Sequence, residues 1–344
     1  MTTKRWEDLA IYQPQVARIL KNSVTGKRLA HAYLFEGPIG TKRFETAMFF
    51  AKVLLCRTRD EEGNPCGECH HCKRVDAGTH PNLFVVRREG EQIKKKQMKD
   101  LIHEFSRESL EEGPRIYVID EAHRLNQESS NTLLKTMEEP GADIYQVLVT
   151  DQINSLLKTI VSRAQVIHFK PIETSKIKED LISKGVDDLD ASAIASYTNN
   201  YDEAATIASD AKYKSLISFV RELFERFAIP KKSPIILFRE SKEGFISDST
   251  LTDFVLSIAA LFQKDVLGAK LGHTDQRLFV SESAILEKLA QSASQQTIED
   301  GLDEILSLKQ RLKYNINATF AFEKLLMTLE RGYYHDVPSR TRSV

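Results

Sequence analysis

The first half of the chain alternates short apolar runs with segments whose apolar residues recur every three or four positions. The apolar runs predict β-strands at 31–35, 83–86, 115–119, 145–149 and 165–169. The periodic segments predict helices at 5–24, with a break at Pro14, and at 43–55, 95–109, 126–139 and 156–161. This alternation indicates an α/β fold with a mostly parallel sheet that helices cover on both faces.

The second half of the chain shows only helical periodicity. Lys170 and Pro171 mark a boundary after the last predicted strand, and small helices are predicted over 172–210. Longer helices follow from 213 onward, and residues 335–344 are predicted to form a polar tail. We therefore expect three domains: an α/β module over 1–170, a helical lid over 171–212 and an all-helical domain over 213–344.

Charged residues are numerous but balanced, with 48 Lys and Arg against 49 Asp and Glu. At a net charge of −1 the field of the whole molecule cannot attract nucleic acid or anionic lipid, so any such contact must be local. The chain has no run of about 18 apolar residues, and its first residues lack the apolar core of a signal peptide. We expect a cytoplasmic protein.

All four cysteines of the chain lie close together, as Cys56, Cys66, Cys69 and Cys72. Crowded thiols in a reducing cytosol are typical of a zinc site, because Zn²⁺ binds four thiolates tetrahedrally and a C-x2-C turn presents two sulfurs to one ion. Four cysteines complete a closed site, so we expect a structural zinc in an insertion at 56–72, with His70 and His71 as competing ligands. Redox-active or unliganded thiols are the alternatives.

A strand, a glycine turn and a helix follow one another over 31–55, as in a phosphate-binding P-loop, G-x-x-x-x-G-K-[ST]. The turn contains Gly37, Gly40 and Thr41, but three positions that define the motif are altered. Lys42 replaces the second glycine, Arg43 replaces the lysine, and Phe44 replaces the residue whose hydroxyl binds Mg²⁺. A Cβ at residue 42 obstructs the loop and Phe cannot bind a metal, so we expect no nucleotide hydrolysis here. Passive nucleotide binding is an alternative.

Asp120 and Glu121 end a buried strand and have the form of a Walker B element, in which the Asp holds Mg²⁺ and the Glu polarises water. Because the loop lacks its hydroxyl, this pair has no evident metal to bind. An acidic strand end that caps the next helix is an equal alternative.

Arg163 follows Ser162 at a predicted corner between a helix and a strand. An arginine that projects from such a corner can complete the site of a neighbouring subunit, and an arginine supplied in trans is worth about 10³–10⁵-fold in phosphoryl transfer. From the residues alone, an exposed arginine paired with a carboxylate is the simpler interpretation.

Taken in order, these segments resemble the clamp-loader branch of the AAA+ proteins, in particular the clamp-loader subunits of bacterial DNA polymerase III. The resemblance rests on the four cysteines and on LAHAYLFEGPIGT at 29–41, AGTHPNLFVV at 77–86, RIYVIDEAHRLNQESSNTLLKTMEEP at 115–140 and TIVSRAQ at 159–165. It covers 29–170 densely, and the lid and helical collar of that family suit the rest of the chain.

The resemblance implies a subunit that works by contact rather than by turnover. Its partners would be gamma/tau-type ATPase subunits and a delta subunit, in a hetero-pentamer that places a sliding clamp on primed DNA. Ser162 and Arg163 match the start of the family's Ser-Arg-Cys motif, whose Arg acts as a finger in the neighbouring ATP site, although Ala164 replaces the Cys. The four cysteines would bind zinc, and the altered loop implies that ATP is not bound in cis and that the chain has no ATPase activity of its own.

Two other functions remain open. One is an ATP-binding motor subunit of a clamp loader, or another AAA+ DNA-dependent ATPase such as a helicase, for which the four letters at 120–123 are the main support. The other is a zinc-stabilised nucleic-acid adaptor.

Overall fold

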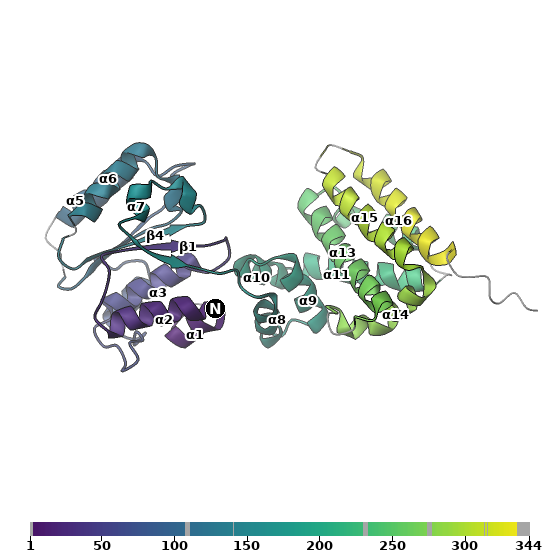
Figure 1. Cartoon of the computed structure of the whole chain (residues 1–344), viewed down its shortest axis with the longest axis horizontal. Coiled ribbons are helices and arrows are strands. Elements are labelled where there is room, and N and C mark those ends of the chain that lie inside the picture. The colour runs from purple at the N-terminus through teal and green to yellow at the C-terminus, as the bar shows by residue number, and fades with distance from the viewer. Residues whose placement is uncertain are drawn as a thin grey trace, which may run out of the picture. The chain divides into compact units, whose positions relative to one another are not determined.

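The computed structural model describes residues 3–106, 111–139, 141–229, 233–273, 277–312, 314 and 316–335. The chain divides into two compact units, Met1–Lys176 and Ile177–Val344 (Figure 1). Among the described residues, no helix has both the length and the apolar character that crossing a membrane requires.

The first unit is built on a five-stranded sheet with the order β2-β3-β4-β1-β5. Neighbouring strands in it are parallel. The strands are β1 Ala32–Glu36, β2 Leu83–Val86, β3 Arg115–Ile119, β4 Ile144–Thr150 and β5 Gln165–His168. The five predicted strands are confirmed, and each begins and ends within one residue of its predicted bounds. Because all five strands are parallel, the loops at their carboxyl ends meet at one edge of the sheet.

Helices cover both faces of this sheet, as Figure 1 shows. One face carries α1 Trp6–Tyr12, α2 Pro14–Thr25 and α3 Arg43–Leu55, and the other carries α5 Lys95–Ser106, α6 Gln127–Glu138 and α7 Lys158–Val161. The alternation of side chains along the strands explains the two cores: Tyr33 and Phe35 of β1 are buried toward the first set of helices, and Leu34 toward the second. The α/β class predicted from the sequence is confirmed.

The helix bounds follow local signals. Pro14 occupies the first position of α2, where its missing N–H is not needed. Asn126 accepts a hydrogen bond from the backbone N–H of Ser129 and so begins α6 one residue after the predicted start. The predicted helix at 156–161 begins only at Lys158. The last residues of the helix predicted at 95–109 lie outside the described part of the chain.

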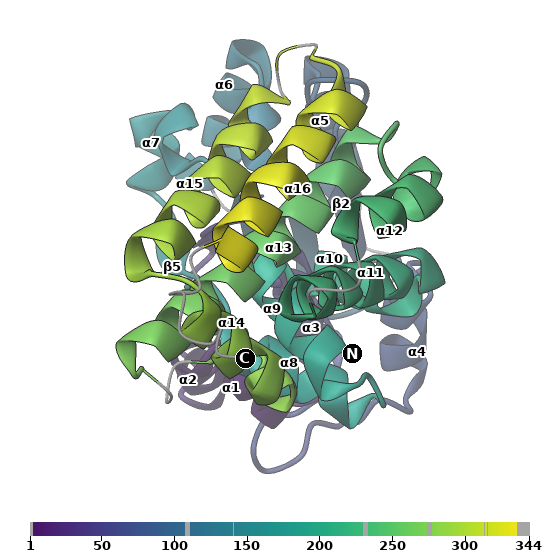
Figure 2. The same cartoon turned by 90° about the vertical axis from the view of Figure 1, so that its right-hand side faces the viewer.

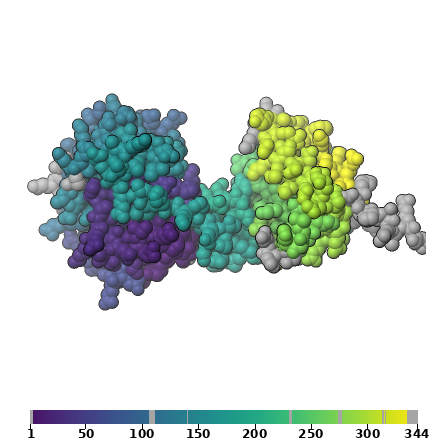
Figure 3. Space-filling model, in the orientation of Figure 1, coloured from purple at the N-terminus to yellow at the C-terminus, as the bar shows by residue number. Residues whose placement is uncertain are grey.

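The second unit is helical throughout its described residues. Its elements are α8 Thr174–Ser183, which leads into it, α9 Asp188–Tyr197, α10 Tyr201–Ser209, α11 Ala211–Ala228, α12 Pro234–Ser241, α13 Ser249–Leu271, α14 Ser283–Ser292, α15 Gln295–Arg311 and α16 Ala318–His335. Helices α15 and α16 run side by side (Figure 2). Green and yellow residues of these later helices form one continuous surface in Figure 3.

Aromatic side chains hold the second unit together. Phe238 of α12 stacks on Phe322 of α16 with ring centroids 4.9 Å apart, and Phe262 of α13 stacks on Phe279 at 4.0 Å. The predicted lid and collar both lie in this unit apart from residues 171–176, so their division into separate domains stays a prediction. The predicted polar tail falls, after His335, outside the described residues.

Candidate functional site

The four cysteine side chains converge on one point after α3. Their sulfur atoms all lie within 4.8 Å of one another. The Sγ atom of Cys66 is 3.7 Å from that of Cys56 and 3.9 Å from that of Cys72. Four thiolates that surround one ion at about 2.3 Å are about 3.8 Å apart, so this arrangement can hold a single tetrahedral metal ion.

The surroundings of the sulfurs favour the thiolate at Cys66 but disfavour it at Cys72. Backbone N–H groups of Cys66, Cys69 and Cys72 donate to the Sγ atoms of Cys56, Cys66 and Cys69, at 3.3–3.4 Å. The Thr58 hydroxyl donates to Cys66 Sγ at 3.2 Å and, with backbone donors, lowers the pKa of Cys66 to about 6. Burial instead raises the pKa of Cys72. A bound cation is therefore what would stabilise the thiolate at Cys72.

His71 pairs with His80 and is grouped with it rather than with the four cysteines. The Nδ1 atom of His71 is 3.0 Å from Nε2 of His80, and the Glu111 carboxylate completes a group whose ligand atoms lie within 4.8 Å of one another. The Nδ1 atom of His80 accepts the backbone N–H of Asn82 at 3.1 Å, so a neutral His80 carries its proton on Nε2 and donates it to His71. Glu111 is bound by the Arg74 guanidinium. These contacts link helix α4 His70–Asp76 to the segments before β2 and β3, and a metal ion at this group would have to displace the hydrogen bond between the two histidines.

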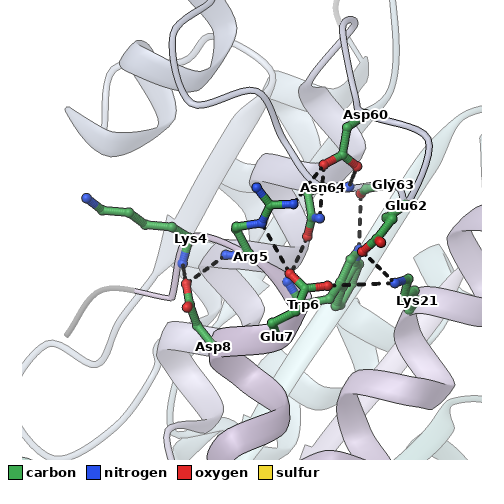
Figure 4. A network of polar contacts seen from close by, with 10 residues as sticks. All are labelled: Lys4, Arg5, Trp6, Glu7, Asp8, Lys21, Asp60, Glu62, Gly63 and Asn64. Atoms are coloured by element: carbon green, nitrogen blue, oxygen red, sulfur yellow. Dashed lines mark hydrogen bonds and ion pairs between the residues drawn. The ribbon is translucent and has the colours of Figure 1, made fainter.

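The insertion is also fastened to the N-terminal helix, as Figure 4 shows. The Oδ1 atom of Asn64 accepts the backbone N–H of Trp6 at 2.7 Å, and the Gly63 carbonyl accepts the indole N–H at 3.1 Å. Asp60 holds Asn64 in place by accepting its backbone N–H at 2.7 Å. Trp6 is 2% exposed and packs edge-on against Phe49 with ring centroids 4.8 Å apart. The loop 60–64 is thus docked by contacts that do not involve the sulfurs.

The glycine turn after β1 keeps the shape of a phosphate loop. A Cβ on Gly37 would lie 2.4 Å from the Phe169 carbonyl oxygen, so only glycine fits there. Lys42 adopts the left-handed conformation with φ 62°, which suits the glycine of an intact loop. Its buried side chain turns to the Tyr12 ring, with Nζ 4.5 Å from the ring centroid. The backbone is therefore preserved where the side chain is not.

The next two residues differ from an intact loop in chemistry. Arg43 is half-buried, and burial lowers its pKa while the charges of Asp151 and Asp120 oppose that shift. Phe44 presents a ring to the Arg87 guanidinium, whose carbon lies 4.6 Å from the ring centroid. The oxygen ligand that Mg²⁺ takes from this position in an intact loop is absent.

Asp120 and Glu121 lie at the same edge of the sheet as the glycine turn. Burial raises the pKa of Asp120, and Arg87 Nε lies 3.7 Å from its Oδ2 atom. Glu121 pairs with Arg88, Nε to Oε2, at 2.6 Å. Neither acid caps the following α-helix, because Asn126 has that role at α6. The structure thus brings the predicted loop and the predicted acids together, each acid beside an arginine.

Arg163 lies at the predicted corner between α7 and β5. Ser162 ends α7, and its hydroxyl donates to the Thr159 carbonyl at 3.2 Å. The Arg163 side chain is 37% exposed, and its Nη2 atom is 2.9 Å from Glu138 Oε1. Arg163 is therefore exposed enough to contact a neighbouring subunit, but it also pairs with a carboxylate, as expected for an ordinary surface arginine.

Residues 12–173 match the family described as DNA polymerase III, delta subunit. DNA polymerase III subunit delta' of Bacillus subtilis (strain 168) is 32% identical over 327 residues, which make up 95% of this chain and 99% of that protein. DNA polymerase III subunit tau/gamma of Haemophilus influenzae is 32% identical over 169 residues, 49% of this chain and 24% of that protein. Among solved structures, a Thermotoga maritima DNA polymerase III gamma subunit-related protein has a TM-score of 0.42 at 16% identity, covering 92% of this chain and 99% of that one. With full-length similarity at this level, the chain belongs to the family of DNA polymerase III delta-prime subunits.

Proposed function

We propose that this chain is a non-hydrolysing subunit of a bacterial clamp loader and that it supplies Arg163 to the ATP site of a neighbouring subunit. The observation that carries the proposal is the contrast between two sites. The phosphate loop has Lys42, Arg43 and Phe44 at its defining positions, whereas Arg163 lies partly exposed at a corner, paired only with the exposed Glu138 carboxylate among the ion pairs of the described residues. A motor subunit would show the reverse contrast.

The cis site lacks what ATP hydrolysis needs. Phosphoryl transfer depends on a metal held by the loop hydroxyl and the Walker B acid, and on a lysine aimed at the phosphates. Here Phe44 offers no oxygen, Lys42 fills the position of the second glycine, and the lysine position carries the half-buried Arg43. Mg²⁺ and nucleotide therefore do not fit the residues present, and we expect no turnover by the chain alone.

The trans role requires Arg163 to leave Glu138. Exposed ion pairs of this kind are worth about 0.2–1 kcal/mol, whereas charge-assisted pairs of Arg with phosphate are stronger and often bidentate. A phosphate presented by a neighbour would therefore displace the carboxylate at little cost. Ser162, which ends α7, would fix the corner from which Arg163 projects.

For the cysteine cluster we propose a structural zinc ion bound by Cys56, Cys66, Cys69 and Cys72. Sulfur separations of 3.7 Å and 3.9 Å suit Zn²⁺, and four thiolates leave no open position for substrate. Bound zinc would link the two ends of the insertion, 56 and 66–72, while the loop 60–64 between them is held by its contacts with α1.

The partners follow from the family. Relatives named delta' and tau/gamma support ATPase subunits of the gamma/tau type and a delta subunit as neighbours, with the sliding clamp and primed DNA reached through the complex. The near-zero net charge of −1 suits such a subunit, because its contacts would be mainly with protein. A cytoplasmic location follows from a role in replication.

Two measurements test this proposal. The purified chain should show no ATP turnover above buffer, with or without DNA, and it should co-elute with gamma/tau-type and delta subunits in size-exclusion chromatography. Mg²⁺-dependent ATP binding at micromolar concentration together with turnover by the isolated chain would instead establish a motor subunit. Failure to join the complex would overturn the clamp-loader role.

A further inference from the structure

Two positions that bind Mg²⁺ in an intact P-loop site are the loop hydroxyl and the first Walker B acid. In this chain they are Phe44 and Asp120, and a single side chain contacts both. The guanidinium carbon of Arg87 lies 4.6 Å from the Phe44 ring centroid, and Arg87 Nε lies 3.7 Å from Asp120 Oδ2. Arg87 comes directly after β2, which neighbours β3 in the sheet, so its backbone belongs to the same edge as Asp120.

We propose that Arg87 is a resident cation that takes the place of the metal and thereby excludes Mg²⁺–nucleotide from this site. The inference rests on the proposed non-hydrolysing function and explains how the site is kept inactive. The altered loop removes one metal ligand, and Arg87 neutralises the other. Both would have to be reversed before the site could bind Mg²⁺–nucleotide, whereas a free divalent ion would need only the Asp120 carboxylate that Arg87 now neutralises.

The other acids at this edge also have basic partners. Glu121 pairs with Arg88 at 2.6 Å, and the Asp151 and Glu36 carboxylates lie 3.0 Å and 2.7 Å from the Nδ1 atoms of histidines 123 and 168. Each of these carboxylates thus has a basic partner of its own, and the charge of Arg43 also acts on Asp120. Arg87 differs from these partners because, among the contacts of the described residues, it is the side chain that reaches both Phe44 and Asp120.

The position of Arg87 does not depend on the acid alone. Its carbonyl accepts a hydrogen bond from Gln97 Nε2 at 2.7 Å, which fixes the backbone and keeps the guanidinium within reach of Asp120 even when Phe44 is replaced. The side chain is 63% exposed, so its removal should not disturb folding. A divalent ion at Asp120 would meet a full positive charge within a few ångströms, and relief of that repulsion should strengthen metal binding about tenfold.

The first test uses a chain whose loop is restored by Lys42→Gly, Arg43→Lys and Phe44→Thr, with Arg87 intact or replaced by Ala. ATP binding is measured by calorimetry in Mg²⁺ and in EDTA. We expect the loop-restored chain to bind ATP equally in both, and the added Arg87→Ala change to strengthen binding about tenfold in Mg²⁺ only. Arg88→Ala in the same background is the matched control and should create no Mg²⁺ dependence. Full Mg²⁺ dependence with Arg87 intact, or equal effects of the two Ala variants, would overturn the proposal.

The second test avoids the multiple loop changes. Free Mn²⁺ is followed by electron paramagnetic resonance during titration of zinc-loaded wild-type, Arg87→Ala, Arg87→Lys and Arg88→Ala chains. Only Arg87→Ala should gain a Mn²⁺ site, and absence of that gain would overturn the inference. ATP turnover by the wild-type chain would overturn the proposed function. If the wild-type chain is inactive and Arg87→Ala gains no Mn²⁺ site, only the role of Arg87 is overturned.

Discussion

The docking of loop 60–64 on α1 makes a sharp stability prediction for Asn64→Ala. Asn64 is 2% exposed, and its Oδ1 atom accepts the backbone N–H of Trp6 at 2.7 Å. The substitution leaves that buried donor without its partner, which costs about 1–3 kcal/mol. It also removes the hydrogen bond from Asn64 Nδ2 to Asp60 Oδ2, which measures 3.1 Å. We therefore expect the free energy of unfolding of the first unit to fall by about 2 kcal/mol.

Trp6 is the one tryptophan of the chain, so its fluorescence reports on this contact directly. The urea concentration at the midpoint of the fluorescence transition should be about 1 M lower for Asn64→Ala than for the wild-type chain. This estimate takes the free energy of unfolding to fall with urea by about 1–3 kcal/mol/M. The control is Asn154→Ala, because Asn154 is exposed in the same unit. A loss below about 0.5 kcal/mol, or one equal to that of the control, would refute the view that Asn64 anchors the loop.

Three further predictions concern the metal, the glycine turn and pH. The purified chain should contain about one zinc ion by elemental analysis and Cys72→Ser should lose it, whereas a fully folded chain without metal would argue against the site. Gly37→Ala should lower the melting temperature more than the control Gly78→Ala. Both glycines have positive φ, but only a Cβ at residue 37 would clash, because it would lie 2.4 Å from a carbonyl oxygen. Equal decreases in melting temperature would contradict this reasoning. Burial lowers the pKa of His80 to about 4 from its usual 6.5, so the unfolded chain binds the proton first as pH falls. The contribution of His80 to stability should therefore be constant above pH 6.5 and fall between pH 6.5 and 4, by up to about 3 kcal/mol in urea titrations, and His80→Asn should flatten the slope in that range.

The sheet could be predicted closely because its three central strands, β1, β3 and β4, are buried along most of their length. Each strand is a short apolar run that ends at a polar or glycine turn, and this signal does not depend on distant residues. β3 shows the rule: Arg115–Ile119 matches the prediction residue for residue. The cysteine cluster was also predictable, because its four ligands lie in one short segment and local turns bring them together.

Contacts between distant segments were not predictable in the same way. Nothing in the spacing of residues 60–64 indicates that Asn64 meets Trp6, because a polar loop gives no periodic signal. The approach of Arg87 to Asp120 depends on the order of strands, which places β2 beside β3, and that order is a property of the whole sheet. The one available signal was that both residues directly follow predicted strands. His71, a competing ligand in the prediction, instead contacts His80, which lies nine residues further along the chain.

The most direct test of the account is the ATPase activity of the reconstituted clamp loader with Arg163→Ala in this subunit. The complex should still assemble, because the side chain contacts only Glu138 and the Thr159 carbonyl among the interactions of the described residues. Turnover at the neighbouring site should fall by about 10³–10⁵-fold, so the part of DNA-stimulated ATP hydrolysis that depends on it is lost. Arg18→Ala, an exposed arginine on α2, is the control and should leave the rate unchanged. An unchanged rate in an intact Arg163→Ala complex would contradict the role of this arginine as a finger in trans.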